Sequence, residues 1–170
     1  MNNIVRHLLS TVIIAPSIFL SLQAQAETSM SIIVEEHDIQ QCKLPLLSIA
    51  DELIGKNSHR LHVDQPKHHA DKYPFTVVGV ISYNDQDAQV VFNASPMVNG
   101  ECEVSYQEVL ALPETCLAVR EQVFKKWEYV GKLSDDSFFL RHKERLTKNA
   151  TLTSIKSGSE CLVTRRHSGI

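Results

Sequence analysis

Four histidines lie close together in the first half of the chain, and these are the residues with the clearest capacity for chemistry. The set comprises His59, His62, His68 and His69. Imidazole nitrogens are good ligands for Zn, Cu and Ni, and short histidine-rich tracts are a compositional sign of metal binding. The cluster therefore predicts a zinc or copper site, held in an exposed loop over residues 58–72.

The same segment also fits a solvated polar loop without a metal. Its spacing matches no standard ligand motif, and the H-E-x-x-H pattern is absent. Arg60, Lys67 and Lys72 lie among the histidines, and their positive charges would repel a cation. The sequence leaves both interpretations open.

A basic stretch in the second half of the chain is the other candidate site. Residues 27–110 hold five Lys and Arg against thirteen Asp and Glu, whereas residues 111–170 hold eleven against seven. Clustered positive charge attracts anionic partners, although an exposed strand edge uses such charges equally well to prevent unwanted pairing. The predicted partner is a protein or an anionic component of the cell envelope, and the predicted contact residues are Arg141, Lys143, Arg145 and Arg165. The acidic balance excludes a uniformly basic nucleic-acid binder.

Motifs for catalysis are missing from the sequence. There is no G-x-S-x-G, no phosphate-binding glycine loop and no dinucleotide fingerprint. We therefore predict no catalytic residues and rank an enzyme of unknown class third among the functions considered.

The first 26 residues have the features of a secretory signal peptide. A mostly apolar run over residues 8–22 follows Arg6, and Ala24 and Ala26 form a small-x-small cleavage site before Glu27. No later stretch is long and apolar enough to cross a membrane. We expect a soluble protein, periplasmic or secreted after cleavage at Ala26-Glu27, with residues 27–170 forming a single domain.

Four cysteines lie in the predicted mature chain, and none of them forms a C-x-x-C pair. An even number of cysteines in an exported protein predicts two disulfides, for which three connectivities exist. The favoured pairing joins Cys102 to Cys116 and Cys42 to Cys161. The first bond would link a strand to the helix that follows it, and the second would tie the first helix to the last strand.

Apolar periodicity predicts the elements of this domain. Helical spacing indicates one helix within residues 39–54, with a kink or a start at Pro45, and a second that begins near Pro113 and continues to Trp127. Residues 32–34 form a short candidate edge strand. Further strands are expected over residues 75–83, 89–94, 102–107, 128–133, 137–141, 150–155 and 160–165. The predicted class is α+β, with a mainly antiparallel sheet of six to seven strands, two helices packed on it, and disulfide staples.

A loose motif resemblance covers roughly the last 70 residues of the chain. A C-x3-Y run is followed by P-x2-C at the start of a helix, then by a G-x-L strand and a final cysteine; the positions are Cys102, Tyr106, Pro113, Cys116, Gly131, Leu133 and Cys161. This pattern resembles a group of small exported bacterial proteins of unknown function, and it carries over no functional residue.

Taken together, these features predict a small periplasmic protein that binds another macromolecule, as inhibitors of cell-wall enzymes and immunity proteins do. The alternative is a metal-binding or metal-sensing protein that uses the loop from His59 to His69.

Overall fold

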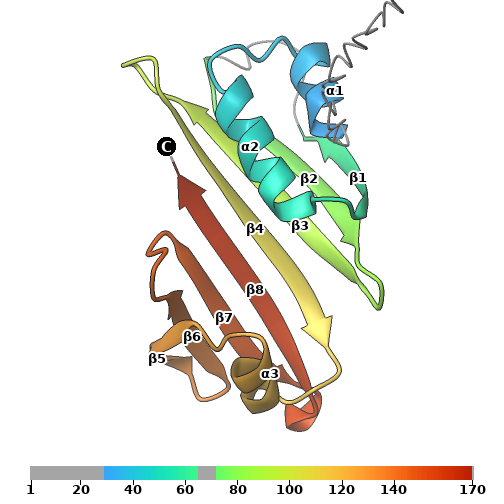
Figure 1. The fold of residues 1–170 in the computed structure, drawn as a ribbon, viewed down its shortest axis with the longest axis vertical. Helices are drawn as coiled ribbons and strands as arrows, with labels where there is room; N and C mark the ends of the chain where they lie inside the picture. The colour runs from blue at the N-terminus through green and yellow to red at the C-terminus, as the bar shows by residue number, and fades with distance from the viewer. Residues whose placement is uncertain (1–28, 65–71, 170) are drawn as a thin grey trace, which may run out of the picture.

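One eight-stranded antiparallel sheet organises the protein (Figure 1). The computed structural model describes residues 29–64 and 72–169, and its strands lie in the order β1-β2-β3-β4-β8-β7-β6-β5. The strands are β1 (Ser58–Val63), β2 (Phe75–Ser82), β3 (Asp87–Pro96), β4 (Cys102–Leu112), β5 (Trp127–Ser134), β6 (Ser137–His142), β7 (Lys148–Ile155) and β8 (Glu160–Gly169). Three α-helices accompany them: α1 (Ser29–Glu36), α2 (Lys43–Ile54) and α3 (Cys116–Gln122). The α+β prediction with an antiparallel sheet is confirmed.

The sheet consists of two similar units joined at its centre. In the first unit, α2 precedes the meander β1–β4 and packs on β3 and β4. In the second unit, α3 precedes the meander β5–β8 and packs on β7 and β8. The fourth strands of the two units, β4 and β8, pair with each other along nine residue positions. The two helices therefore lie over separate halves of one continuous sheet.

All three helices cover the same face of the sheet (Figure 1). Side chains alternate between the two faces of a strand, and in β4 the buried Cys102, Val104 and Tyr106 point toward the helices. Cross-strand partners share a face, so Val163 of β8, which lies opposite Leu110, also points toward a helix. We call this side the helix-covered face and the opposite side the helix-free face, since no helix of the described residues packs on it.

The apolar core is divided between the two units. The cluster under α1 and α2 includes Leu46, Ile54, Val77 and Phe92. A smaller cluster lies under α3, and its buried members are Cys116, Val119, Phe124, Leu140, Ala150, Leu152, Cys161 and Val163. Polar side chains occupy the helix-covered face between the two clusters, as described below.

Both disulfides form, but the predicted pairing was wrong. Cys42 bonds Cys102, and Cys116 bonds Cys161. The error came from the expected strand, which stopped at residue 107, whereas β4 continues to Leu112. At about 3.3 Å per residue, this strand carries the chain roughly 30 Å away from Cys102 before α3 begins. Each disulfide instead joins the start of a unit's helix to the start of its fourth strand.

Several predicted boundaries also differ from the structure. Residues 32–34 belong to α1, because Met30, Ile33 and Val34 are buried at helical spacing. Helix α3 begins at Cys116 rather than near Pro113, and the side chain of its N-cap residue Thr115 accepts a hydrogen bond from the backbone nitrogen of Ala118. This helix ends at Gln122, so that Trp127 starts β5 instead of extending the helix.

The predicted loop over residues 58–72 was wrong in its first part, where Ser58–Val63 forms β1. Leu61 of this strand lies directly opposite Gly79 of β2. A Cβ atom at position 79 would lie 2.4 Å from the backbone oxygen of Arg60 and 2.6 Å from Leu61. Glycine at this position therefore allows β1 to approach the sheet closely.

Candidate functional site

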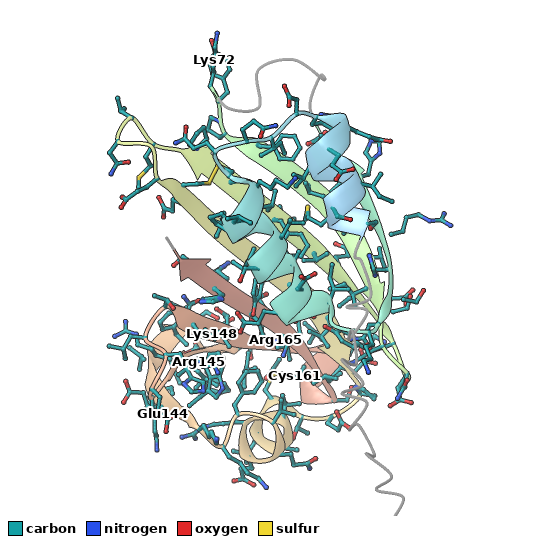
Figure 2. The ribbon with its side chains drawn as sticks, turned by 45° about the horizontal axis from the view of Figure 1, so that its top comes forward. Lys72, Glu144, Arg145, Lys148, Cys161 and Arg165 are labelled. Carbon is teal, nitrogen blue, oxygen red and sulfur yellow. A yellow bond between two sulfur atoms is a disulfide. The ribbon has the colours of Figure 1, made fainter. Side chains whose placement is uncertain are left out.

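Polar residues gather where the two units meet on the helix-covered face. Two cross-strand pairs of the central strands lie there, Tyr106 with His167 and Glu108 with Arg165. Figure 2 shows Arg165, Arg145 and Lys148 between α2 and α3. We call this region the junction, and its charged side chains form two groups, one around Glu108 and one around Glu52.

Glu108 is a fully buried carboxylate with charged and neutral hydrogen-bond donors. Arg165 donates to one carboxylate oxygen through Nε and also pairs with it through Nη2, while the hydroxyl of Tyr83 donates to the other oxygen. Buried charges are tolerated when a counter-charge and hydrogen bonds satisfy them. Burial raises the pKa of Tyr83, and the bond to Glu108 raises it further. Burial alone would lower the pKa of Arg165, but the charge of Glu108 and the hydrogen bond to it together outweigh that effect and raise the pKa.

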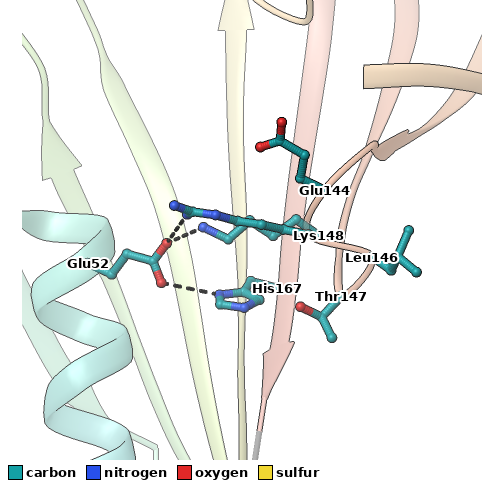
Figure 3. A pocket seen from close by; sticks show the side chains of 7 residues that line it. Glu52, Glu144, Leu146, Thr147, Lys148 and His167 are labelled. Atoms are coloured by element: carbon teal, nitrogen blue, oxygen red, sulfur yellow. Dashed lines mark hydrogen bonds and ion pairs between the residues drawn. The ribbon is translucent and has the colours of Figure 1, made fainter. Parts of the chain in front are cut away.

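Glu52 connects the end of α2 to the second unit (Figure 3). Its Oε1 pairs with Nζ of Lys148 and lies 3.3 Å from Nη1 of Arg145, and its Oε2 lies 3.5 Å from Nδ1 of His167. These residues line an open hollow of about 790 Å³ together with Glu144, Leu146 and Thr147. The group around Glu52 therefore joins a helix of the first unit to β7 and β8 of the second.

The surroundings of Glu52 and His167 lower the pKa of both groups. Burial would raise the pKa of Glu52, but the hydrogen bond and charge of Lys148 outweigh it. Burial lowers the pKa of His167, and the charge of Lys148 adds to this effect. A charged glutamate and a neutral histidine are therefore the favoured forms. In both groups of the junction the carboxylate is matched by cations, an arrangement suited to holding the two units together.

The helix-free face carries a different set of side chains. One register row crosses all eight strands and comprises His62, Val78, Val91, Gln107, Arg166, Asn149, Arg141 and Glu128. The adjacent row includes Val80, Val109, Thr164, Thr151 and Phe139. This face thus mixes β-branched, aromatic and amide side chains.

The structure does not bring the described histidines of the predicted metal site together. His59 points toward the helix-covered face, where its Nε2 accepts a hydrogen bond from the backbone nitrogen of Ser29 and its Nδ1 lies 2.9 Å from the backbone oxygen of Asn57. His62 is three positions further along β1 and points to the helix-free face. His68 and His69 lie outside the described residues, within which no group of three potential metal ligands occurs. The zinc or copper site stays a prediction.

The four predicted partner-binding residues lie on both faces of the sheet. Arg141 is exposed on the helix-free face, and Lys143 is exposed just beyond the end of β6. Arg145 pairs with Glu52, and Arg165 pairs with the buried Glu108. Their role as one partner-binding set stays a prediction, because the structure does not place them in a single patch.

Sequence reasoning missed the carboxylates of the junction. Glu108 has the same parity along the chain as Cys102, Val104, Tyr106, Leu110 and Leu112. A strand extended to Leu112 would have marked Glu108 as an inward-facing charge in need of a partner. No comparable local signal exists for Glu52, because its partners lie more than ninety residues away along the chain.

No family model matches this chain, and neither the curated proteins nor the solved structures contain a significant match. The resemblance to small exported bacterial proteins stays a prediction. The predicted signal peptide over residues 1–26 lies outside the described residues. Within residues 29–64 and 72–169, no helix has the length and apolar character of a membrane span.

Proposed function

We propose that this chain is an exported protein, periplasmic or secreted, that acts by binding another folded protein through its helix-free face. An inhibitor or an immunity protein would work in this way. The observation that carries the proposal is the one-sided covering of the sheet: all three described helices pack on one face, and the other face spans eight strands.

The size of this face fits a protein partner. Eight strands spaced about 4.8 Å apart give a width of roughly 34 Å, and eight residues along a strand give roughly 26 Å. The product is on the order of 800 to 900 Å², which is close to the ~800 Å² that each partner contributes to a standard interface.

The chemistry of the face also fits a protein partner. Apolar side chains lie among short hydroxyl and amide side chains; they are Val78, Val80, Val91, Val109, Phe139 and Leu162. Valine and threonine lose little rotamer freedom when they are covered. The two disulfides support export, because such bonds persist in oxidising compartments.

Capture from a cell-envelope extract of the source organism, combined with two matched variants, tests this proposal. Val109→Arg places a charge at the centre of the helix-free face, whereas Val98→Arg places the same charge on the fully exposed turn between β3 and β4. We expect the wild type and Val98→Arg to retain the same partner and Val109→Arg to lose it.

A melting curve for each variant shows whether it folds. If Val109→Arg does not fold, Thr164→Arg on the same face serves as a second probe. A partner that binds Val109→Arg and Thr164→Arg with the same affinity as the wild type would contradict the proposal. The absence of any captured partner would contradict it too.

A further inference from the structure

We infer that a polar hollow at the centre of the helix-free face binds a carboxylate group presented by the partner protein. This inference rests on the proposed function and adds the chemistry of the partner. The hollow has a volume of about 210 Å³. The helix-free-face residues that line it are Asn93, Ser105, Gln107, Asn149, Arg166 and Ser168, and Tyr106 of β4 and His167 of β8 also belong to its lining.

The lining residues come together through strand register. Gln107 of β4 lies opposite Arg166 of β8, and Arg166 lies opposite Asn149 of β7. In the next row, Ser105 lies between Asn93 and Ser168. The hollow is therefore fixed by four neighbouring strands, β3, β4, β8 and β7, and not by a loop.

Hydrogen bonding leaves this hollow rich in donors. The Oδ1 atom of Asn93 accepts a hydrogen bond of 3.0 Å from the hydroxyl of Thr76. The Oε1 atom of Gln107 accepts one of 2.8 Å from Nε of Arg166. The amide oxygens of Asn93 and Gln107 are thus occupied, whereas the NH₂ groups of these two residues and the Nη atoms of Arg166 donate to no side chain among the described residues. A group with several acceptor atoms complements this arrangement.

The charge of the hollow favours an anion. Arg166 is exposed, forms no ion pair among the described residues, and is the one charged residue in the lining. Glu103 lies two positions before Ser105 on the same face but does not line the hollow. A planar carboxylate can accept two hydrogen bonds from the guanidinium group and further ones from the amides. The side chain of an aspartate or glutamate on the partner has the chemistry and the size for this site.

Titration with a small probe tests the site separately from the partner. The probe is N-acetyl-glutamate N-methylamide, and N-acetyl-glutamine N-methylamide is its uncharged control. NMR follows the side-chain amide signals of Asn93 and Gln107 and the Nε–H signal of Arg166. We expect saturable shifts with the glutamate probe and none with the glutamine probe.

Two variants sharpen this experiment. Arg166→Gln removes the charge and should weaken binding of the probe by at least about tenfold. Gln107→Glu replaces a donor with an acceptor of the same shape; it keeps a partner for Arg166 and should abolish binding without unfolding the protein. Lys125→Gln removes an exposed charge after α3 and should leave the affinity unchanged. Equal shifts with both probes, the absence of saturable shifts, or wild-type affinity in Gln107→Glu would each overturn the inference.

The two proposals can fail separately. If Val109→Arg loses the partner but Gln107→Glu keeps it, the protein-binding function holds and the carboxylate site is wrong. If Val109→Arg keeps the partner, the proposed function is wrong, and the probe titration alone decides whether the hollow binds a carboxylate.

Discussion

The two units of the sheet share one plan but bury very different cores. Each unit has a helix followed by four strands, and each has a disulfide from the start of the helix to the start of the fourth strand. Among the described residues, the first unit has a helix of 12 residues, additional cover from α1 and a cluster of 18 buried residues. The second has a helix of 7 residues and a cluster of 8.

This difference appears most clearly at the outer strand of the second unit. In β5, Tyr129, Val130 and Leu133 are each about half exposed or more. Helix α3 packs chiefly on β7 and β8 and reaches β5 through Arg120, whose guanidinium group lies over the ring of Tyr129. Burial of apolar surface is the main stabilising contribution to folding. The second unit should therefore depend more heavily on its disulfide and on the junction with the first unit.

The largest expected effect comes from removing the disulfides one at a time. The bonds close sequence separations of 60 and 45 residues, and the chain-entropy model assigns about 4 kcal/mol to each. We expect the Cys116→Ala/Cys161→Ala variant to lose hydrogen-exchange protection in β5–β8 while β1–β4 stay protected. The Cys42→Ala/Cys102→Ala variant should keep a more uniform protection pattern, because its larger core remains. The opposite result would show that core size does not decide which unit depends on its disulfide.

A second experiment compares two arginines of the junction, each of which forms an ion pair with a glutamate of the first unit. Arg165→Met leaves the buried Glu108 without its counter-charge and should cost about 3–5 kcal/mol in the free energy of unfolding. Arg145→Met removes an exposed partner from Glu52, which is itself 39% exposed, and should cost less than about 1 kcal/mol. Urea unfolding of both variants measures the difference. Similar losses would mean that burial of the carboxylate does not set the strength of this connection.

The smallest expected effect is a dependence of the free energy of unfolding on pH, caused by Glu52 and His167. His167 has a folded-state pKa below its ordinary value of 6.5, so the unfolded chain binds the proton more readily. Its contribution to stability is therefore lost as the pH falls below about 6.5 toward the lowered pKa. Glu52 also has a lowered pKa, and its contribution is lost at more acidic values, as the pH falls from about 4.5 through that pKa.

Unfolding experiments at pH 8, 6, 5 and 4 test this two-step decline. His167→Gln should remove the part of the decline that begins near neutral pH and leave the acidic part in place. A wild-type protein that gains stability between pH 7 and pH 5 would contradict the assigned direction for His167.

Much of the fold could be predicted from local sequence patterns. Strands β2, β7 and β8 correspond to the strands expected over residues 75–83, 150–155 and 160–165, because strand periodicity depends only on neighbouring residues. Strand β1 was missed because its alternation of His59, Leu61 and Val63 with polar residues is weak and lies within a histidine-rich segment.

The parts that could not be predicted depend on register between distant strands. The pairing of β4 with β8 decides which cysteines meet, brings Arg165 to Glu108 and places Arg166 beside Gln107. Shifting this register by one residue would send each of these side chains to the other face. The excess of basic residues in the second half of the chain does not form one patch, because the alternation of side chains along the strands places Arg141 and Arg165 on opposite faces of the sheet.

The connectivity of the disulfides also has a consequence for biogenesis. Along the chain, the first cysteine bonds the second and the third bonds the fourth. A chain that enters an oxidising compartment with its N-terminus first would expose each correct partner before any competing cysteine that follows it. Oxidation in order of emergence would then give the native bonds directly, with no need for a disulfide isomerase to exchange mispaired ones. The first unit could be oxidised and folded while the second is still being translocated.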